Sequence, residues 1–278
     1  MTRTESACLA VDIGGTTTRA ALVQGGRLTR RLEAPTPASA GPAQVIGQVL
    51  ALLDGLDAPA QLPLAVACTG RVHQGHVTAV NQGTMPGWTA VPVQTTLQRD
   101  TGRAVTVIND AKAATVAEWH AAGMPGNFMF VTVSTGIGSG LVLQGRLLNA
   151  ADGPDVGLGF TRGLNGQPLE ATVSGRGLEA LAAETGGVRA LFDAAERGHA
   201  SAQALLSGPL HLLADRVHDA HCLLGLDAVT LGGSVGLRDW TRAVLQGALP
   251  DLSLRRAVHG ADAGLLGAAL YAAQEQTK

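Results

Sequence analysis

An internal repeat constrains the fold of this chain more than any other feature. The apolar runs at 8–11 and 128–133 are each followed by a turn of glycine and hydroxyl residues, at 13–18 and 134–140. In both copies a second apolar run, a tight glycine-bearing turn and a short third strand pattern come next. Such turns between apolar runs are typical of β-hairpins. The repeat therefore predicts two β-rich halves, each carrying a glycine–hydroxyl turn between its first two strands.

The first glycine–hydroxyl turn also carries a carboxylate. Asp12 stands at the end of the apolar run, the glycines after it let backbone N–H groups approach an anion, and the threonines offer hydroxyl donors. Asp12 would repel a phosphate directly, but it can hold a hydrated Mg²⁺ that binds one. The turn therefore predicts half of a metal–nucleotide site, with Asp12 binding Mg²⁺ through water. Its expected nucleotide-binding residues are Asp12, Gly14, Gly15, Thr16 and Thr17.

Two further turns of this kind predict the rest of the nucleotide site. One such turn is weak evidence, since glycines in turns usually serve backbone geometry alone, but three at the ends of apolar strands favour a nucleotide. A Rossmann turn is excluded because a hairpin follows 136–140, and no Gly-Lys-Ser/Thr of a P-loop occurs. The expected nucleotide-binding residues are Ser134, Thr135, Gly136 and Gly138 in the second turn and Gly232 and Gly233 in the third.

Asn109 and Asp110 stand where a predicted strand at 104–108 meets a predicted helix at 111–121. Two interpretations of Asp110 stay open: it caps the helix, or it is the base that accepts a hydroxyl proton during phosphoryl transfer. Beside a nucleotide site the second interpretation is favoured, and the amide of Asn109 is then placed to orient a polyol. Lys112 also has two interpretations, as a solvated residue or as a phosphate ligand.

The composition excludes several classes of function. Only 15% of the 278 residues are charged, the net charge is −2, and no basic cluster offers a footprint for nucleic acid. No uninterrupted apolar run reaches the roughly 18 residues that a membrane span needs, so no membrane partner is expected. The first residues lack the features of a signal peptide, and a cytoplasmic protein is therefore predicted.

The residue types that bind transition metals are scattered along the chain. Cys8, Cys68 and Cys222 are isolated, which is typical of reduced and mostly buried thiols and argues against a cysteine-based zinc site. His218 and His221 are one helical turn apart but have no evident acidic third ligand, so no metal site is expected there.

The order of the predicted elements suggests two α/β domains that face a cleft. An N-terminal α/β domain is expected over residues 1–110 and a C-terminal α/β domain over residues 111–261. The last predicted helix, within 262–278, is expected to pack back on the N-terminal domain.

Five motifs, in this order and spacing, resemble the ROK (repressor, ORF, kinase) family, and the resemblance covers nearly the whole chain. They are the segments 12–16, 109–110, 134–140, 174–177 and 232–236. The resemblance implies an α/β, two-domain actin-like ATPase (ribonuclease H-like) fold with a central cleft. It implies Mg-ATP as the phosphoryl donor, a sugar 6-hydroxyl as the acceptor, Asp110 as the catalytic base and often a homodimer.

Within that family the chain is most similar to bacterial N-acetylmannosamine kinases, through the segments 35–39, 131–136 and 262–270. Glu170, just before the motif at 174–177, matches a family glutamate that contacts the sugar. The substrate-binding residues that the resemblance implies are Gly70, Asn81, Thr84, Asn109, Asp110 and Glu170.

The chain departs from the family pattern around 155–168. Gly157 takes the place of a sugar-contacting acid or histidine, Phe160 replaces a zinc-binding histidine, and the zinc cysteines are absent, so no zinc site is expected. In the sugar loop, Thr84 stands where the family has an asparagine, and Asn81 lies nearby as a substitute. These changes fall on the expected sugar contacts, so they affect the prediction of the sugar more than the prediction of the phosphoryl donor.

The leading hypothesis is a zinc-independent kinase that phosphorylates the 6-hydroxyl of a hexose or N-acetylhexosamine, with N-acetylmannosamine as the first choice. A glucokinase-type hexose kinase is the alternative of the same class. A catalytically weak sugar- or nucleotide-binding regulator is the alternative from another class. The retention of Asp12 and Asp110 favours a kinase, because a protein that only binds would not need the base.

Overall fold

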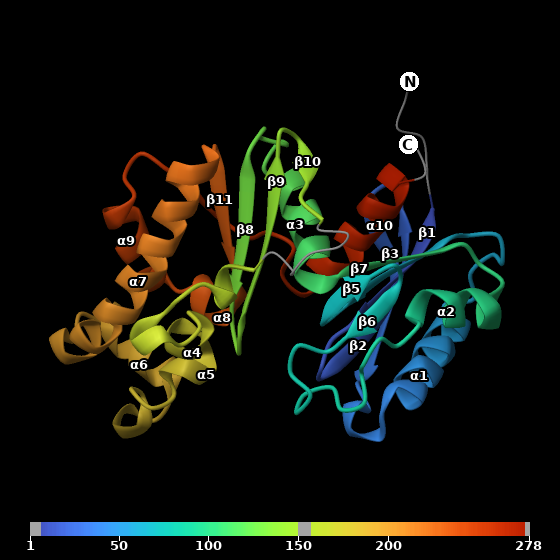
Figure 1. The fold of residues 1–278 in the computed structure, drawn as a ribbon, viewed down its shortest axis with the longest axis horizontal. Coiled ribbons are helices and arrows are strands. Elements are labelled where there is room, and N and C mark those ends of the chain that lie inside the picture. The colour runs from blue at the N-terminus through green and yellow to red at the C-terminus, as the bar shows by residue number, and fades with distance from the viewer. Residues whose placement is uncertain (1–6, 150–156, 276–278) are drawn as a thin grey trace. The chain divides into compact units, whose positions relative to one another are not determined.

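The computed structural model describes residues 7–149 and 157–275, and these residues form two compact units. The first unit comprises residues 7–117, residue 149 and residues 261–275 of the described chain. The second comprises residues 118–148 and 157–260. Figure 1 colours the chain by position, and the first unit contains both the blue strands from the N-terminal part and the red helix from the C-terminal part.

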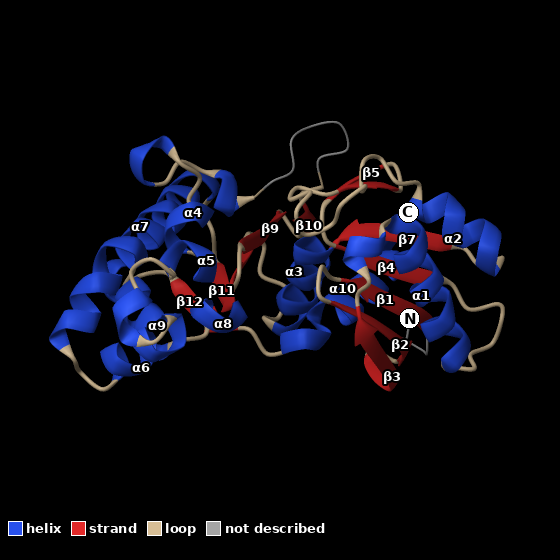
Figure 2. Cartoon of the chain, turned by 90° about the horizontal axis from the view of Figure 1, so that it is seen from below, coloured by secondary structure: helices blue, strands red, loops and turns tan. Residues whose placement is uncertain are grey.

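The first unit is built on a five-stranded mixed sheet in the order β3-β2-β1-β4-β7. Strands β1 and β2 and strands β2 and β3 are antiparallel hairpin partners, whereas β1, β4 and β7 run parallel. Figure 2 shows these strands in red. The strands are β1 (Cys8–Ile13), β2 (Thr17–Gln24), β3 (Arg27–Pro35), β4 (Leu64–Cys68) and β7 (Val105–Asn109).

The second unit has a sheet with the same topology, in the order β10-β9-β8-β11-β12. Here β8, β9 and β10 form the antiparallel part, and β11 and β12 continue the sheet in parallel from β8. The repeat in the sequence therefore corresponds to a repeated five-stranded sheet. The strands are β8 (Phe128–Val133), β9 (Ile137–Leu143), β10 (Arg146–Leu147), β11 (Ala228–Gly232) and β12 (Ser253–Arg256).

The burial of each strand explains its composition. All five residues of β4 are buried, and β1 is buried except at Asp12, as expected for central strands that are covered on both faces. β3 lies at the sheet edge and is mostly exposed, with a run of arginines that keeps the edge from pairing with another chain.

The helices of the first unit complete its core. In α1, apolar residues at helical spacing (Val45, Ile46, Val49 and Leu53) are buried against the sheet. The helices are α1 (Pro42–Gly55), α2 (Val93–Thr101), α3 (Asp110–Ala121) and α10 (Ala263–Glu275), with short turns η1 (Ala38–Ala40) and η5 (Gly260–Asp262) and a small hairpin of β5 (Arg71–His73) and β6 (His76–Thr78). The chain passes from the first unit to the second within α3.

Helix α10 packs on β1 and β4, so a C-terminal helix completes the unit that begins with the N-terminal strands. Two glycines make this possible. A Cβ at Gly267 would lie 1.6 Å from the carbonyl oxygen of Ala113, and one at Gly264 would lie 2.8 Å from the carboxylate carbon of Asp12. Residues 276–278 of the predicted last helix lie outside the described residues.

The second unit carries its helices around the other sheet. Its core joins α6, α7 and α9 to the apolar side chains of β8 and β11. The elements are α4 (Glu170–Val173), α5 (Gly175–Leu178), α6 (Val188–Glu196), α7 (Ala200–Leu224), α8 (Gly233–Gly236) and α9 (Asp239–Ala248), with short turns η2 (Leu158–Phe160), η3 (Leu164–Gly166) and η4 (Ala183–Thr185). Among the helices in the described part of the chain, none has both the length and the apolar character needed to cross a membrane.

Candidate active site

Two carboxylates lie at the carboxyl edge of the parallel strands in the first unit. Asp12 is near the end of β1, and Asp110 follows β7 as the first residue of α3. The pairing of Ile13 with Cys68 and of Cys68 with Asn109 aligns the ends of β1, β4 and β7 in one row. This is the edge where open α/β sheets place their ligands.

The two carboxylates influence each other's charge. Burial and the negative charge of Asp110 together raise the pKa of Asp12 to about 7, against the opposing effect of the Arg19 guanidinium. Arg19 Nη1 lies 3.8 Å from Asp12 Oδ2, a separation at which it offsets only part of the effect. A cation at this edge would therefore be stabilised by both carboxylates.

Asp110 is held by hydrogen bonds from its neighbours. Its Oδ1 accepts from Asn109 Nδ2 at 2.9 Å and from the Ala111 N–H at 2.8 Å, and the Thr69 hydroxyl also donates to the carboxylate. Burial raises the pKa of Asp110, while these hydrogen bonds act to lower it. The carboxylate is therefore fixed in orientation and more basic than an exposed aspartate.

Asn109 is the residue that caps α3. Its Oδ1 accepts from the Lys112 N–H at 3.0 Å, three residues on, as a helix N-cap does. Its two amide hydrogens go to the Gly70 carbonyl oxygen, at 2.9 Å, and to Asp110 Oδ1. Asn109 is therefore the N-cap of α3, whereas Asp110 is the first residue of the helix and accepts from the adjacent Ala111 N–H.

Gly70 supports Asn109 through its backbone. It has φ +115°, and a Cβ there would lie 2.7 Å from the Thr78 carbonyl oxygen, so a side chain is excluded by both conformation and space. Because the Gly70 carbonyl accepts from Asn109, the glycine fixes the amide that in turn fixes Asp110.

The first glycine–hydroxyl turn is closed by backbone and threonine hydrogen bonds. The Gly14 N–H donates to the Thr17 carbonyl oxygen at 3.1 Å, and Thr36 Oγ1 donates to the Gly14 carbonyl oxygen at 2.8 Å. Thr36 Oγ1 also lies 2.8 Å from Thr18 Oγ1, which is buried. Thr16 is exposed and Thr17 is partly exposed, so these two hydroxyls remain accessible to a ligand.

The predicted sugar loop packs against this turn. A Cβ at Gly15 would lie 2.5 Å from Thr84 Cγ2, so the Thr84 methyl group occupies the space over the glycine. The loop is shaped by Asn81, whose Oδ1 accepts from the Gly83 N–H at 2.9 Å and whose carbonyl accepts from Thr84 N–H at 3.1 Å. The exposed Asn81 side chain thus stabilises the loop that brings Thr84 to Gly15.

The second glycine–hydroxyl turn, in the second unit, is bound to the start of α4 and α5. The Ser134 carbonyl accepts from the Gly175 N–H at 2.6 Å. Glu170 Oε2 accepts from the Ile137 N–H at 2.7 Å and lies 2.6 Å from where a Cβ of Gly136 would be. Glu170 therefore contacts the turn directly. Gly138 pairs with Thr132 inside the β8–β9 hairpin.

The third turn, at the end of β11, needs its glycines for close packing. Gly233 has φ +81°, and a Cβ on it would lie 2.3 Å from the Val133 carbonyl oxygen. A Cβ on Gly232 would lie 2.9 Å from the Phe130 ring. These glycines thus have a structural reason as well as the predicted nucleotide role.

The chain is similar to known proteins over nearly its whole length. A model of the ROK family matches residues 8–275. The chain belongs to the ROK family. The N-acetylmannosamine kinase of Salmonella paratyphi B is 36% identical to this ROK chain, over 95% of the chain and 97% of that kinase. The family predicted from the five motifs is therefore confirmed.

Solved structures confirm the predicted fold. The ROK hexokinase of Thermus thermophilus has a TM-score of 0.85 and 30% identity, covering 98% of this chain and 99% of that one. The ROK family glucokinase of Streptomyces griseus, solved with glucose and AMPPNP, has a TM-score of 0.78 and 23% identity, covering 96% and 99%. The ROK protein thus has the actin-like ATPase fold, with its two α/β units.

The two departures of this ROK chain at 157 and 160 are coupled in space. A Cβ on Gly157 would lie 2.7 Å from Cδ2 of the Phe160 ring, so the ring occupies the room that a larger residue 157 would need. Leu158 N–H donates to Ser139 Oγ at 2.7 Å, which holds η2 on β9. Residues 155 and 156 of the altered segment lie outside the described residues.

Lys112 is buried, so its interpretation as a solvated residue is wrong. Its Nζ donates to Asn149 Oδ1 at 3.0 Å, and Asn149 Nδ2 donates to the Tyr271 hydroxyl at 3.3 Å. Lys112 thus joins α3 to Asn149, and through Asn149 to α10, within the first unit.

No three His, Cys, Asp or Glu side chains of residues 7–149 and 157–275 gather as a metal site. His218 Nε2 lies 3.4 Å from Cys222 Sγ, and His221 Nδ1 lies 3.0 Å from the Leu226 carbonyl oxygen. Asp12 fits Mg²⁺, which is commonly held by one or two carboxylates while it keeps several waters.

Proposed function

We propose that this ROK protein is an ATP-dependent sugar kinase that transfers the γ-phosphoryl group of Mg-ATP to the 6-hydroxyl of N-acetylmannosamine. The observation that carries the proposal is the geometry of Asp110, which is held by Asn109 and the Ala111 N–H at the carboxyl edge of the parallel strands. The 36% identity to an N-acetylmannosamine kinase over nearly the whole chain supports the acceptor.

Asp110 serves as the base. It accepts the proton of the sugar hydroxyl as the oxygen of that hydroxyl forms a bond to the γ-phosphorus and the bond to the β-phosphate oxygen breaks. Its raised pKa makes the carboxylate a stronger proton acceptor than an exposed aspartate, and its hydrogen bonds keep it in one orientation through the reaction. The products are the sugar 6-phosphate, ADP and the proton held by Asp110.

Mg²⁺ belongs beside Asp12 in this proposal. Asp12 would hold the ion through water, and the ion would supply positive charge against the phosphate oxygens. Burial and the negative charge of Asp110 raise the pKa of Asp12. A divalent cation would offset this negative charge. The proposed nucleotide-binding residues are Gly14, Gly15, Thr16 and Thr17 in the first unit and Ser134, Thr135, Gly136, Gly138, Gly232 and Gly233 in the second.

The sugar-binding residues have different roles in this proposal. Both amide hydrogens of Asn109 are used within the protein, so Asn109 can meet a sugar hydroxyl only as an acceptor through Oδ1. Gly70 acts through its carbonyl, which holds Asn109. Asn81 and Thr84 shape the loop over Gly15, and Glu170 offers a carboxylate beside the second turn.

The acceptor is tested by an ADP-release assay with N-acetylmannosamine, N-acetylglucosamine, glucose and mannose. N-acetylmannosamine should have the highest kcat/KM. A higher kcat/KM for glucose would favour the second candidate, a glucokinase-type hexose kinase, which the 30% identity to a ROK hexokinase supports. Nucleotide binding without turnover of any sugar would favour a regulator that binds but does not catalyse.

We further propose that the protein works in the cytoplasm as a homodimer, as its resemblance to ROK kinases implies. Cys8, Cys68 and Cys222 are free thiols, which fits a reducing compartment. Sedimentation equilibrium of the full chain tests the dimer, and a monomer at micromolar concentration would contradict it.

A further inference from the structure

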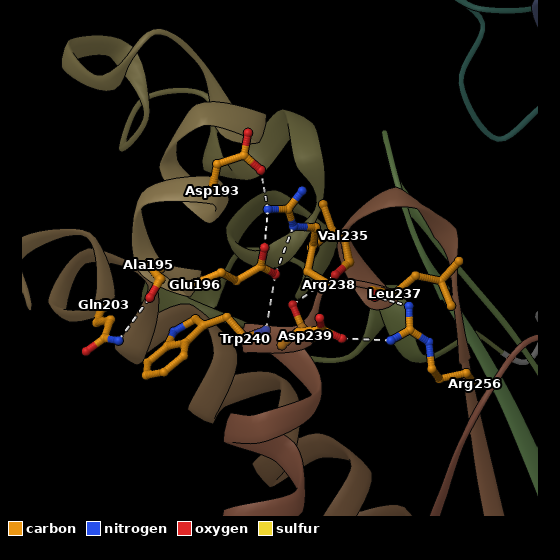
Figure 3. A network of polar contacts seen from close by, with 11 residues as sticks. Asp193, Ala195, Glu196, Gln203, Val235, Leu237, Arg238, Asp239, Trp240 and Arg256 are labelled. Atoms are coloured by element: carbon orange, nitrogen blue, oxygen red, sulfur yellow. Dashed lines mark hydrogen bonds and ion pairs between the residues drawn. The ribbon is translucent and has the colours of Figure 1, made fainter. Parts of the chain in front are cut away.

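Arg238 is the centre of a polar network in the second unit (Figure 3). Its Nη2 contacts the carboxylates of Asp193 and Glu196, both from α6, and its Nε donates to Glu196 Oε1 at 3.1 Å. The guanidinium also lies over the Phe192 ring, 5.5 Å from its centroid. Arg238 therefore binds three side chains of one helix.

The segment 234–237 connects Arg238 to Gly233 of the third glycine turn. The turn continues into α8, where the Leu237 N–H donates to the Gly233 carbonyl oxygen at 2.9 Å and the Arg238 N–H donates to the Val235 carbonyl oxygen at 3.2 Å. Any shift of Arg238 is thus transmitted to Gly233 through a short, hydrogen-bonded helical turn.

The other side of the same segment is fastened by Arg256 of β12. Its Nη1 donates to Asp239 Oδ1 at 2.7 Å, and its Nη2 donates to the Leu237 carbonyl oxygen at 2.9 Å. Thr241 Oγ1 donates to the Val235 carbonyl oxygen at 2.8 Å. The segment after the glycine turn is therefore held from α6 on one side and from β12 on the other.

The glycine turn needs such support because it has few side chains of its own. Gly232 and Gly233 can bind a ligand only through backbone groups, and glycine loses more conformational freedom on ordering than any other residue. Ser234 is exposed. Packing against β8 holds the turn from one side, and Arg238 adds a polar connection from the same segment to α6.

The ionic character of the network makes Arg238 hard to replace. Burial acts to lower the pKa of Arg238, but Asp193 and Glu196 together outweigh it and raise the pKa, and Arg238 in turn lowers the pKa of Asp193. A planar guanidinium can meet two carboxylates and stack on a ring at the same time, whereas the ammonium of lysine is a point charge.

We propose that Arg238 is a positioning residue for nucleotide binding: by tying α8 to Asp193 and Glu196, it sets the backbone of Gly232 and Gly233 to receive the nucleotide. This inference rests on the proposed function, because it requires that the third turn binds ATP. It assigns no contact between Arg238 and substrate.

The test compares Arg238→Met and Arg238→Lys with the wild type and with Arg216→Met. Arg216 is a matched control, since it also forms an ion pair in the second unit, with Asp219 on α7. KM is measured for ATP and for the sugar, and the Kd of ADP is measured by calorimetry without sugar. The ADP measurement separates this inference from the identity of the acceptor.

Arg238→Met should raise the KM for ATP and the Kd of ADP by about tenfold, the scale of one lost charged hydrogen bond, and change the KM for sugar less than twofold. Arg238→Lys should give a smaller rise, and Arg216→Met none. Equal increases in both KM values, or an unchanged Kd of ADP in a folded variant, would overturn the proposal.

If Arg238→Met fails to fold because two carboxylates lose their cation, Glu196→Gln provides the second test. It weakens the same contact while keeping Arg238 and Asp193 paired. It should raise the Kd of ADP in the same direction by a smaller factor, and no change in that Kd would overturn the proposal. A wild type that binds no nucleotide would remove both this inference and the proposed donor.

Discussion

The two sheets of this protein share one topology and differ in the chemistry at corresponding positions. In the first sheet the residue before the last of the first strand is Asp12, paired with Arg19 on β2. In the second sheet the corresponding residue is Thr132, paired with Gly138 on β9. A repeated fold has thus produced one charged turn and one neutral turn.

The difference extends to the last strand of each sheet. In the first sheet β7 is followed by a capped helix and the Asp110 carboxylate. In the second sheet β12 is followed by backbone N–H groups of Val258 and His259, which donate to the buried Glu118 carboxylate. The topology is therefore repeated, while single residues decide whether the corresponding strand ends carry charge.

The largest expected effect is at Asp110. Asp110→Asn should lower kcat by about 10²–10⁴-fold, because the variant cannot accept the proton, while the Kd of ADP stays near that of the wild type. The assay is ADP release with calorimetry of ADP binding. Ser134→Ala, in the neutral turn, is the matched change and should lower kcat far less. Near-wild-type turnover by Asp110→Asn would remove Asp110 from the mechanism.

The second prediction concerns pH and Asp12. Folding raises the pKa of this acid from 3.8 to about 7, so the folded chain binds the proton more tightly than the unfolded chain. The contribution of Asp12 to the free energy of unfolding is therefore largest below pH 4, and it is lost as the pH rises toward 7. Asp12→Asn should therefore raise Tm at pH 8 without metal, and raise it less at pH 5, where only part of this contribution has been lost.

The same substitution should weaken the activation of the enzyme by Mg²⁺. Asp12→Asn loses the charge that holds Mg²⁺, so the Mg²⁺ concentration for half-maximal rate should rise by an order of magnitude or more. Arg19 keeps a partner in the variant, because its Nε also donates to Glu33 Oε2 at 3.3 Å. A lower Tm at pH 8, measured by differential scanning fluorimetry, would show that Asp12 stabilises the metal-free fold.

A smaller effect is expected at Asn109, where two functions can be separated. Asn109→Ala removes the helix cap and the hydrogen bond to Asp110, and should cost about 1 kcal/mol of stability and about tenfold in kcat. Asn109→Ser keeps a capping oxygen and should recover the stability but not kcat. Recovery of both would mean that the amide does not position Asp110. Urea unfolding and steady-state rates are the measurements.

The smallest effect is expected at the coupled pair in the second unit. Gly157→Ala places a methyl group 2.7 Å from the Phe160 ring, which is 48% exposed and can shift. The free energy of unfolding should therefore fall by about 1 kcal/mol. In the double variant Gly157→Ala/Phe160→Ala, the free energy of unfolding should fall by less than the sum of the two single changes, because the methyl group no longer meets the ring. Additive changes in the free energy of unfolding would show that the ring and residue 157 are independent.

The sequence predicted the long and strongly patterned elements well. Helix α3 begins one residue before its predicted start, and the strands of the repeat occur where the glycine turns indicate. The hairpin of β5 and β6 and the helices α2 and α9 are not predicted from the sequence, although the apolar residues of α9 recur at helical spacing.

The residues of the candidate site also divide into those that the sequence indicates and those that it does not. Residue type and position single out Asp12 and Asp110 as candidates, whereas they do not indicate the contacts that Thr36 and Arg238 make. Thr36 supports the first turn from the end of another strand, and Arg238 meets partners more than forty residues away in the chain. No local pattern marks such residues, since their partners are brought to them only by folding.

The sequence by itself determined the repeated strand–turn pattern, the carboxylates and the ROK family, because apolar periodicity, turn glycines and motif spacing are local properties of the chain. The tertiary structure alone decided that Asn109 caps α3, that Lys112 is buried and that Phe160 fills the space beside Gly157. Each of these depends on which side chains meet in three dimensions, and close packing rather than local preference makes that choice.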